Sequence, residues 1–450
     1  MSKGLKITIF VGASAFLLLF LVTTFAPPSR AEAEKYFTAK EIDNGLQFSL
    51  QRRLLYWAGA GLHLAALALI VFTGFARKLA DLFASWVGGR WLWTVLLVGG
   101  FCFLVEEAIS LPISLARLEL VRAWGLTKRP VADWLADHAI GLAISGVIGA
   151  VTLLGLYLLI RYFPRIWWAL ATMGTMLLAI GYIFILPIVI SPLFNTFTPL
   201  AKTKWANFQA PLRELANQGG VPAKEIFVVN ASRQGSHTNA YFTGFGATQR
   251  IVLFDTLFQS HTRITPDMST RLVGVLGAPM GAGAFQGSFF VLAIQAQGED
   301  ELKSVFAHEM GHWQHNHIVK GTVMAAVAVL VGFFLLARIL RWAVNRPPFL
   351  LKTPFDPAGI PLVLLLVTVG EWLVSPVQNA VSRHFERQAD MVSLELTRTP
   401  DVFIAAEKKL ARDNISNVAP PLVSVWFFNS HPPAVERIQM AEEWKMQNEK

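Results

Sequence analysis

Long uninterrupted runs of apolar residues are the dominant pattern along this chain. Seven runs approach or exceed the roughly 17–25 residues that a helix needs to cross a hydrocarbon core about 30 Å thick. They occupy residues 7–26, 54–75, 92–113, 139–160, 167–190, 323–342 and 360–376. The pattern predicts a mainly α-helical multi-pass membrane protein. The last run is the least regular, because Glu371 lies inside it and it continues into a more polar helix.

The first apolar run also has features of a cleaved signal peptide. Lys3 and Lys6 precede it, and Ala31-Glu32-Ala33 follows it. Its length of about 20 residues exceeds the ~7–15 apolar residues of a signal core. We therefore interpret it as the first membrane helix.

Residues 191–317 form the most polar stretch, between the fifth and sixth apolar runs. The β-branched and aromatic segments 225–229 and 250–254 predict strands, and 239–245 could join them in a small sheet. We expect an α+β domain over 191–321 between five membrane helices (1–190) and two more (322–378). Residues 379–450 would return to that domain.

A metal-binding motif stands on a predicted helix in this domain. Residues 308–312 read His308-Glu309-Met310-Gly311-His312, after a segment with helical periodicity and neither Gly nor Pro. Histidines four residues apart share one helical face, so both imidazoles can bind one Zn²⁺. Glu309 is then placed to act as a general base toward a water at the open position. The motif predicts a hydrolase with one zinc ion per chain.

The third ligand should be another His, Glu or Asp. His315 lies about two turns, or roughly 10 Å, from His308 along the helix, and His317 points elsewhere, so we place both outside the ligand set, as groups that support the ligands or lie on the surface. Glu386 shares a helical face with Asn379, Arg383 and Asp390 and can complete a His/His/Glu site. Asp390 could accept the free ring N–H of a ligating histidine. The alternative is a solvated face with Arg–Glu and Arg–Asp pairs along the helix.

With these residues in view, the chain resembles the type I CAAX prenyl endopeptidases, which are integral-membrane zinc metalloproteases of the gluzincin kind. The matching blocks keep the family's order through the C-terminal half and extend more weakly to Leu111-Pro112 and the apolar runs before it. The blocks are residues 192–200, 236–242, 250–257, 308–317, 382–390 and 430–438.

The resemblance implies a role for each matching residue. It makes His308, His312 and Glu386 the zinc ligands and Glu309 the catalytic base, as the spacing also suggests. It implies further that Asn239 and Ala240 belong to an edge strand that pairs with the substrate backbone. It places His431 and Arg437 near the substrate and the oxyanion. The alternative for these two is structural: His431-Pro432-Pro433 would turn the chain, and Arg437 would pair with a carboxylate.

The resemblance also implies that the membrane helices surround a water-filled chamber and that the substrates are prenylated CAAX proteins. Glu106, Glu107 and Glu371 could line such a chamber, although Glu106 and Glu107 could equally lie at a membrane surface. The glycine-rich stretch within 262–298 departs from the family pattern and is interpreted as an insertion. It would be a membrane-facing or cleft-covering hairpin, or a loop without a specific role.

Composition agrees with a membrane enzyme. Of 450 residues, 54% are hydrophobic and only 15% are charged, against about 25% charged in soluble domains. The net charge of +9 favours contact with anionic lipid headgroups, and no nucleic-acid motif is found. The single cysteine, Cys102, excludes an intramolecular disulfide. We expect a peptide or protein substrate, which can be lipidated, and membrane lipids as partners.

Two arguments about orientation conflict. Short loops on the N-terminal side of the membrane carry eleven lysines and arginines, and those on the other side carry nine. The positive-inside rule would then place the zinc domain outside the cytoplasm. The resemblance implies a cytoplasmic zinc domain, and we follow the resemblance.

Three functions remain open from the sequence. The leading one is a zinc endopeptidase that cuts lipidated or membrane-associated substrates near their C-termini. The second is a general quality-control protease for membrane proteins. The third is a transporter with a structural metal site, which Glu309 argues against, because a structural site closes with four protein ligands and needs no base.

Overall fold

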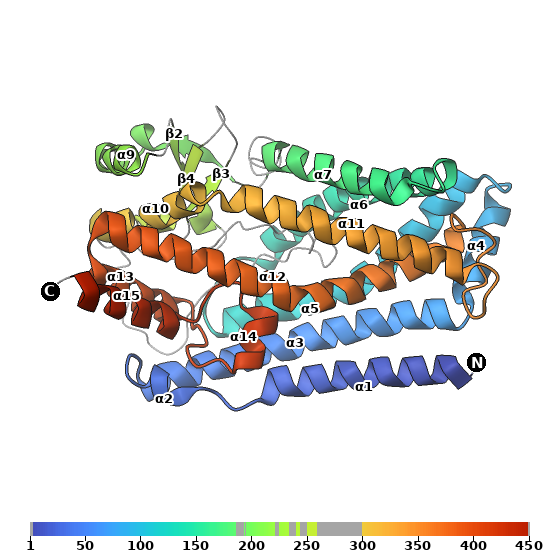
Figure 1. The fold of residues 1–450 in the computed structure, drawn as a ribbon, viewed down its shortest axis with the longest axis horizontal. Coiled ribbons are helices and arrows are strands. Elements are labelled where there is room, and N and C mark those ends of the chain that lie inside the picture. Colours follow the sequence, from blue (N-terminus) through green and yellow to red (C-terminus); the bar gives the residue numbers. More distant parts are fainter. Residues whose placement is uncertain are drawn as a thin grey trace.

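The computed structural model describes residues 3–185, 193, 195–220, 225–233, 240–243, 250–258 and 299–448. Long helices fill most of it, and a small sheet with shorter helices lies at one end (Figure 1). The helices are α1 (Lys3–Phe25), α2 (Arg30–Ala33), α3 (Ala39–Phe72), α4 (Phe75–Trp86), α5 (Trp91–Ala123), α6 (Val131–Tyr162), α7 (Trp167–Ile185), α9 (Gln209–Gln218), α10 (Glu299–Gln314), α11 (His317–Ala343), α12 (Ile360–Thr397), α13 (Pro400–Asp413), α14 (Leu422–Phe428) and α15 (Ala434–Asn448). The strands are β1 (Phe197–Pro199), β2 (Glu225–Val229), β3 (Ala240–Thr243) and β4 (Arg250–Phe254).

Six of the described helices are long and apolar enough to cross a membrane. They are α1, α3, α5, α6, α11 and α12, and each coincides with a predicted crossing. The predicted crossing at 167–190 corresponds to α7, which is apolar but shorter, and its predicted end lies outside the described residues. The helical membrane architecture is therefore confirmed, and the seventh crossing stays a prediction.

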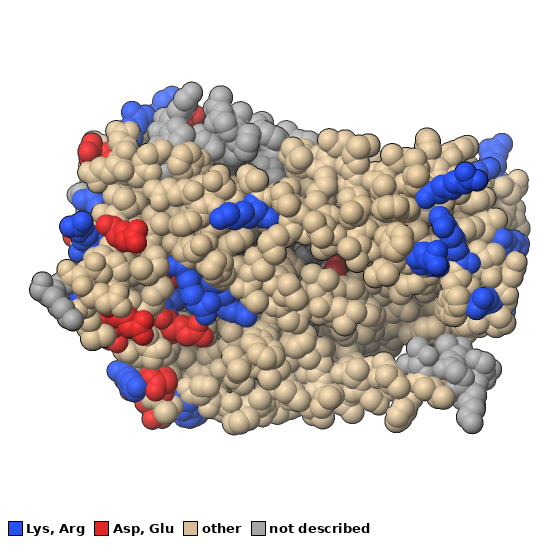
Figure 2. Space-filling view, viewed as in Figure 1, with Lys and Arg blue, Asp and Glu red and all other residues tan. Residues whose placement is uncertain are grey.

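The membrane helices leave large apolar side chains uncovered. Phe10, Leu104, Val147 and Leu373 are 66–75% exposed. On the face shown in Figure 2, a broad band with very little charge separates a basic end from an end that carries both signs of charge. Exposed apolar area of this extent is typical of a surface in contact with lipid.

Helix α12 connects the membrane to the small domain at the end of the bundle. Its 38 residues span about 57 Å, nearly twice the hydrocarbon core. It passes through Pro376 without ending and crosses residue 378, where the sequence suggested a domain boundary. The C-terminal part of α12, which carries Glu386, therefore projects beyond the membrane into the domain, and the suggested boundaries at 190, 321 and 378 stay predictions.

The sheet of the small domain has the strand order β1-β2-β4-β3. β2 and β4 are parallel, and β1 and β3 are antiparallel to their neighbours. Alternate residues of β2 and β4 are buried in one core with residues of α10, as a half-covered sheet requires. That core includes Ile226, Val228, Ile251, Leu253, Leu302, Val305, Phe306 and Met310. The predicted sheet beside the motif helix is confirmed, and the predicted insertion at 262–298 lies outside the described residues.

Helices α10 and α12 touch through their backbones. A Cβ atom built on Gly311 would lie 2.7 Å from Ala389 Cα and 3.1 Å from its carbonyl oxygen. Two turns away, the Ser393 hydroxyl donates to the Ser304 carbonyl at 2.8 Å, and the two hydroxyls lie 3.0 Å apart. Only glycine fits at position 311, and its absence of a side chain sets the distance between the two helices.

We predict that Gly311→Ala lowers the free energy of unfolding by about 1–3 kcal/mol, because the new methyl group must push the helices apart. Gly321→Ala, in α11, is the matched control, since nothing lies within 4 Å of the added Cβ. Thermal unfolding of the purified proteins in detergent compares them. Equal midpoints for the two variants would contradict the close packing of α10 on α12.

Candidate metal centre

The motif residues lie on the buried face of α10. The side chains of His308 and His312 are 1% and 7% exposed, and Glu309 is also buried. The helix continues from Glu299 to Gln314 without a break, so the histidines stand one turn apart on one face. Glu386, on α12, is fully buried opposite them.

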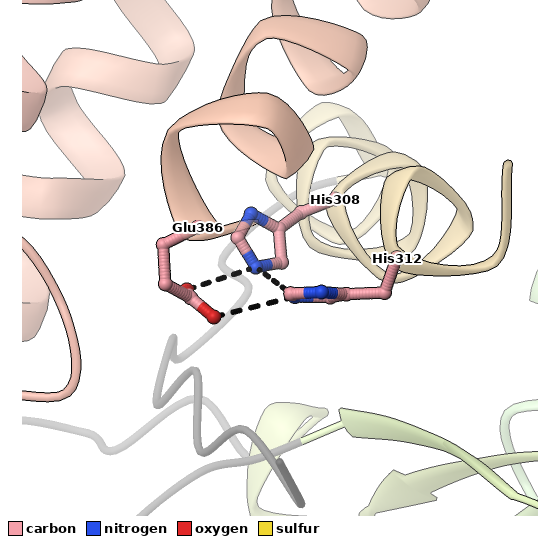
Figure 3. Close-up of side chains that lie close together, drawn as sticks. All are labelled: His308, His312 and Glu386. Atoms are coloured by element: carbon pink, nitrogen blue, oxygen red, sulfur yellow. Dashed lines mark hydrogen bonds and ion pairs between the residues drawn. The ribbon is translucent and has the colours of Figure 1, made fainter. Parts of the chain in front are cut away.

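Three side chains that can bind a metal, His308, His312 and Glu386, converge between these helices (Figure 3). The Nε2 atoms of His308 and His312 are 3.1 Å apart. Each lies 3.4 Å from a different carboxylate oxygen of Glu386. Tetrahedral zinc with bonds of about 2.0–2.1 Å holds its ligand atoms about 3.3–3.4 Å apart. The observed spacings therefore fit one zinc ion bound by two imidazoles and a carboxylate.

The environment of Glu386 also fits a cation. Both carboxylate oxygens are buried, and among the described residues no donor makes a hydrogen bond of suitable geometry to either of them. Burying a carboxylate without such partners is costly. Arg383 does not supply a donor, because its guanidinium binds the carbonyls of Val425 and Asn429. The alternative of a solvated, salt-bridged face is thus wrong for this part of α12.

Asp390 lies behind His308, on the side of the ring away from the donor cluster. The Nδ1–H of His308 donates to Asp390 Oδ1 at 2.8 Å, which leaves Nε2 to face Glu386. Burial by itself lowers the pKa of His308, but the hydrogen bond to Asp390 and the negative charges of Asp390 and Glu386 outweigh it and raise the pKa to about 10. The pocket therefore stabilises positive charge at this position.

The two imidazoles are not equivalent. Burial, together with the charge of His308, lowers the pKa of His312 to about 3. His312 therefore stays neutral and can offer a ring nitrogen lone pair to a metal at any ordinary pH.

Arg437 pairs with two carboxylates instead of facing the cluster. Its Nε donates to Asp390 Oδ2 at 2.8 Å, and its Nη1 lies 2.8 Å from Glu407 Oε1. Asp390 separates it from His308, so the guanidinium is on the far side of that ring from Glu386. The structure therefore has the structural alternative for Arg437, in which the guanidinium pairs with neighbouring carboxylates.

His431 lies at the edge of the cluster. Its Nε2 is 3.3 Å from Glu386 Oε2, and its side chain is 28% exposed. Helix α14 leads into this segment, and α12 holds it in place. Asn379 donates to the carbonyls of Trp426 and Phe427, close to the bonds from Arg383. His431 is thus brought to the three proposed ligands, with its Nε2 buried toward Glu386 and another part of its ring exposed.

Asn239 and Ala240 were expected to pair with the substrate backbone, and only one of them is among the described residues. Asn239 lies outside the described residues, and Ala240 begins β3, where it pairs with Leu253. Among the described strands, β3 lies at one edge of the sheet, with β4 beside it, and it packs beside α10. The backbone N–H and C=O groups of β3 therefore lie next to α10, the helix that carries the His308–His312 motif.

Two further buried polar residues lie near the site, and their contacts were not expected from the sequence. His317 contacts His312, although a straight helix would place it elsewhere. Glu407 contacts Arg437, and its signal in the sequence is its place among apolar residues at helical spacing in α13. That buried stripe includes Phe403, Ala406 and Ala411.

Comparisons with known proteins point to proteolysis. A family model for peptidase family M48 matches residues 202–445, and one for the CAAX prenyl protease N-terminal region, five membrane helices, matches residues 8–196. The uncharacterized metalloprotease YhfN of Bacillus subtilis is 28% identical over 419 residues, covering 92% of this chain and 88% of its own. A CAAX prenyl protease 1 homolog of Oryza sativa is 31% identical over 349 residues, covering 75% of this chain and 71% of its own.

The fold itself has a solved counterpart. The crystal structure of S. mikatae Ste24p superimposes with a TM-score of 0.75 and covers 96% of this chain and 97% of its own. At 22% identity the likeness concerns the fold.

We predict that Arg437→Met lowers the free energy of unfolding by about 3–5 kcal/mol, because Asp390 and Glu407 are left buried without their shared cation. Adding Glu407→Gln should recover part of the loss, because it removes one of the two carboxylates. Thermal unfolding of the purified variants measures both effects. An Arg437→Met protein that unfolds like the parent but has lost turnover would instead favour direct contact with the oxyanion.

Proposed function

This chain belongs to peptidase family M48 and is a membrane metalloprotease, and from that premise we propose that it cuts prenylated CAAX-type or other membrane-associated substrates near their C-termini. The observation that carries the proposal is the buried convergence of His308, His312 and Glu386 next to Glu309. The metal that this donor set fits is zinc.

The reaction assigned to the site is hydrolysis of a peptide bond. Zinc bound there would act as a Lewis acid, polarising the scissile carbonyl and lowering the pKa of a water to about 7. Glu309 would take a proton from the attacking water and deliver it to the leaving amine. His431, partly exposed at the edge of the cluster, would donate a hydrogen bond to the developing oxyanion.

We assign Asp390 and Arg437 a supporting role. Asp390 accepts the Nδ1–H of His308 and so directs Nε2 toward the metal. Arg437 holds Asp390 from the other side and, in this proposal, acts on His308 only through that carboxylate. This revises the role near the oxyanion that the resemblance implied for Arg437.

The substrate backbone would bind along β3. An edge strand offers unpaired N–H and C=O groups to an extended peptide, which is bound by main-chain hydrogen bonds. Ala240, and Asn239 next to it in sequence, are the residues proposed for this pairing. Because β3 packs beside α10, a peptide added there would run past the zinc ligands.

Polar groups between the membrane helices support a hydrated interior for lipidated substrates. Glu107 on α5 and His138 on α6 approach each other to 2.5 Å, and Glu106 and Glu371 are half-buried. Figure 2 shows a hollow within the uncharged band, with acidic atoms at its bottom. Ionisable groups inside a membrane face a polar interior or a partner, because contact with lipid is costly.

A paired peptide assay tests hydrolysis and substrate class together. A farnesylated CAAX peptide and its unlipidated twin are incubated with purified protein in detergent. We predict cleavage of the farnesylated peptide and a loss of about 10²–10⁴-fold in Glu309→Gln, as expected when a general base is removed.

The twin peptide decides between two kinds of protease. Equal cleavage of both peptides would favour a general quality-control protease. Cleavage by Glu309→Gln at the parental rate would contradict the role of Glu309. No cleavage of either peptide by protein that holds one zinc per chain would overturn the CAAX assignment.

We propose further that the zinc domain faces the cytoplasm, as the resemblance to CAAX endopeptidases implies. The basic end of the molecule, near α4, would then face outward, against the positive-inside rule (Figure 2). Because Cys102 is buried, single cysteines can report the orientation.

A membrane-impermeant maleimide added to intact cells should label Ser85→Cys on α4 and leave Glu443→Cys on α15 unlabelled until the cells are opened. Both positions are exposed in the structure. The reverse labelling pattern would place the zinc domain outside the cytoplasm.

A further inference from the structure

His317 lies behind the three proposed zinc ligands and links His312 to Gln388 through a chain of contacts. It is the first residue of α11 and is 1% exposed. Its Nδ1 lies 2.8 Å from Nδ1 of His312, and its Nε2 lies 2.9 Å from Oε1 of Gln388 on α12. Because His312 presents its other nitrogen to Glu386, His317 contacts the opposite edge of that ring and cannot bind the same ion.

The protons in this line have one consistent arrangement. The Oε1 atom of Gln388 can only accept a hydrogen bond, so Nε2 of His317 must carry a proton. The neutral His317 ring then has a lone pair at Nδ1, which accepts the Nδ1–H of His312. His312 is left with its lone pair at Nε2, which faces His308 and Glu386.

We propose that His317 and Gln388 are positioning residues that fix the tautomer and ring orientation of His312 for metal binding. The inference rests on the proposed metal site. Asp390 fixes the tautomer of His308 in the same way, by accepting its Nδ1–H. Each of the two ligating rings is therefore oriented through its Nδ1. One ring is directed by a carboxylate and the other by a neutral imidazole and amide.

The His317 ring is itself held by stacking. It lies nearly parallel to Phe385, with centroids 4.2 Å apart at 8°, and to His315, at 5.5 Å and 12°. Phe385 directly precedes Glu386 in α12, and Gln388 follows two residues later. One segment of α12 therefore supplies a metal ligand and both a stacking surface and an acceptor for His317.

Two substitutions at position 317 separate the lone pair from the packing. His317→Phe keeps a flat ring between Phe385 and His315 but removes the acceptor. His317→Asn loses the stacking but offers its Oδ1 near the position of Nδ1. We predict zinc binding about 10–100-fold weaker in His317→Phe, with most of it recovered in His317→Asn.

Two substitutions at position 388 test the direction of the proton chain. Glutamate can only accept at this position, as the chain requires, so Gln388→Glu should bind zinc at least as tightly as the parent. Methionine has a similar length but accepts hydrogen bonds only weakly, so Gln388→Met should bind zinc about 10-fold more weakly.

Zinc affinity is measured by competition with a chromogenic chelator, and the visible spectrum of the Co²⁺-loaded proteins reports ligand geometry. Thermal unfolding of the metal-free variants shows that each one is folded. A His317→Phe protein that is folded and binds zinc like the parent would overturn the inference, as would Gln388→Glu binding as weakly as Gln388→Met. A parent that binds no zinc would overturn the proposed site itself.

Discussion

The close contact between α10 and α12 is the constraint on which the site depends. Two of the three proposed ligands stand on one helix and the third on the other, so the distance between the helix axes sets the size of the metal pocket. Gly311 against Ala389 brings the backbones together, and the serine pair at 304 and 393 fixes their register. A site built on packed helices holds its geometry better than one built on loops.

The close packing of α10 on α12 buries two carboxylates, and each of them requires a compensating positive charge nearby. Glu386 and Asp390 are both fully buried within one turn of α12, and such carboxylates are tolerated only with compensating partners. A bound metal would compensate Glu386. Asp390 is compensated by Arg437, which α15 supplies and which also meets Glu407 of α13. The C-terminal helices are thereby tied to the metal site, although neither contributes a proposed ligand.

Two of the membrane helices, α11 and α12, also carry residues of the proposed metal site. α12 begins in the membrane and ends in the protease domain, and α11 begins with His317 beneath His312 before it enters the membrane. The residues proposed to direct the two ligating rings therefore sit on helices that also cross the membrane. A substrate that enters between these helices would approach the metal site from the side on which α11 and α12 support it.

Sequence reasoning reached the parts of the site that helical spacing controls. The 3.6-residue period placed His308 and His312 on one face and Glu386 with Asp390 on another, and hydropathy located the six described helices that are long enough to cross a membrane. It kept His317 outside the ligand set but missed its contact with His312, because it extended one straight helix, whereas Asn316 adopts a left-handed conformation with φ of 53° and starts a new helix. It left Arg437 open because its carboxylate partners lie 47 and 30 residues away in sequence, and only tertiary packing joins them.

X-ray absorption at the zinc edge of the purified protein tests the proposed metal centre most directly. One zinc per chain, with a nitrogen and oxygen shell at about 2.0–2.1 Å, a two-imidazole pattern and no sulfur, is the predicted result. Glu386→Gln should lose most of that zinc while His315→Gln keeps it. Absence of zinc, or a shell unchanged in Glu386→Gln, would contradict the His/His/Glu site.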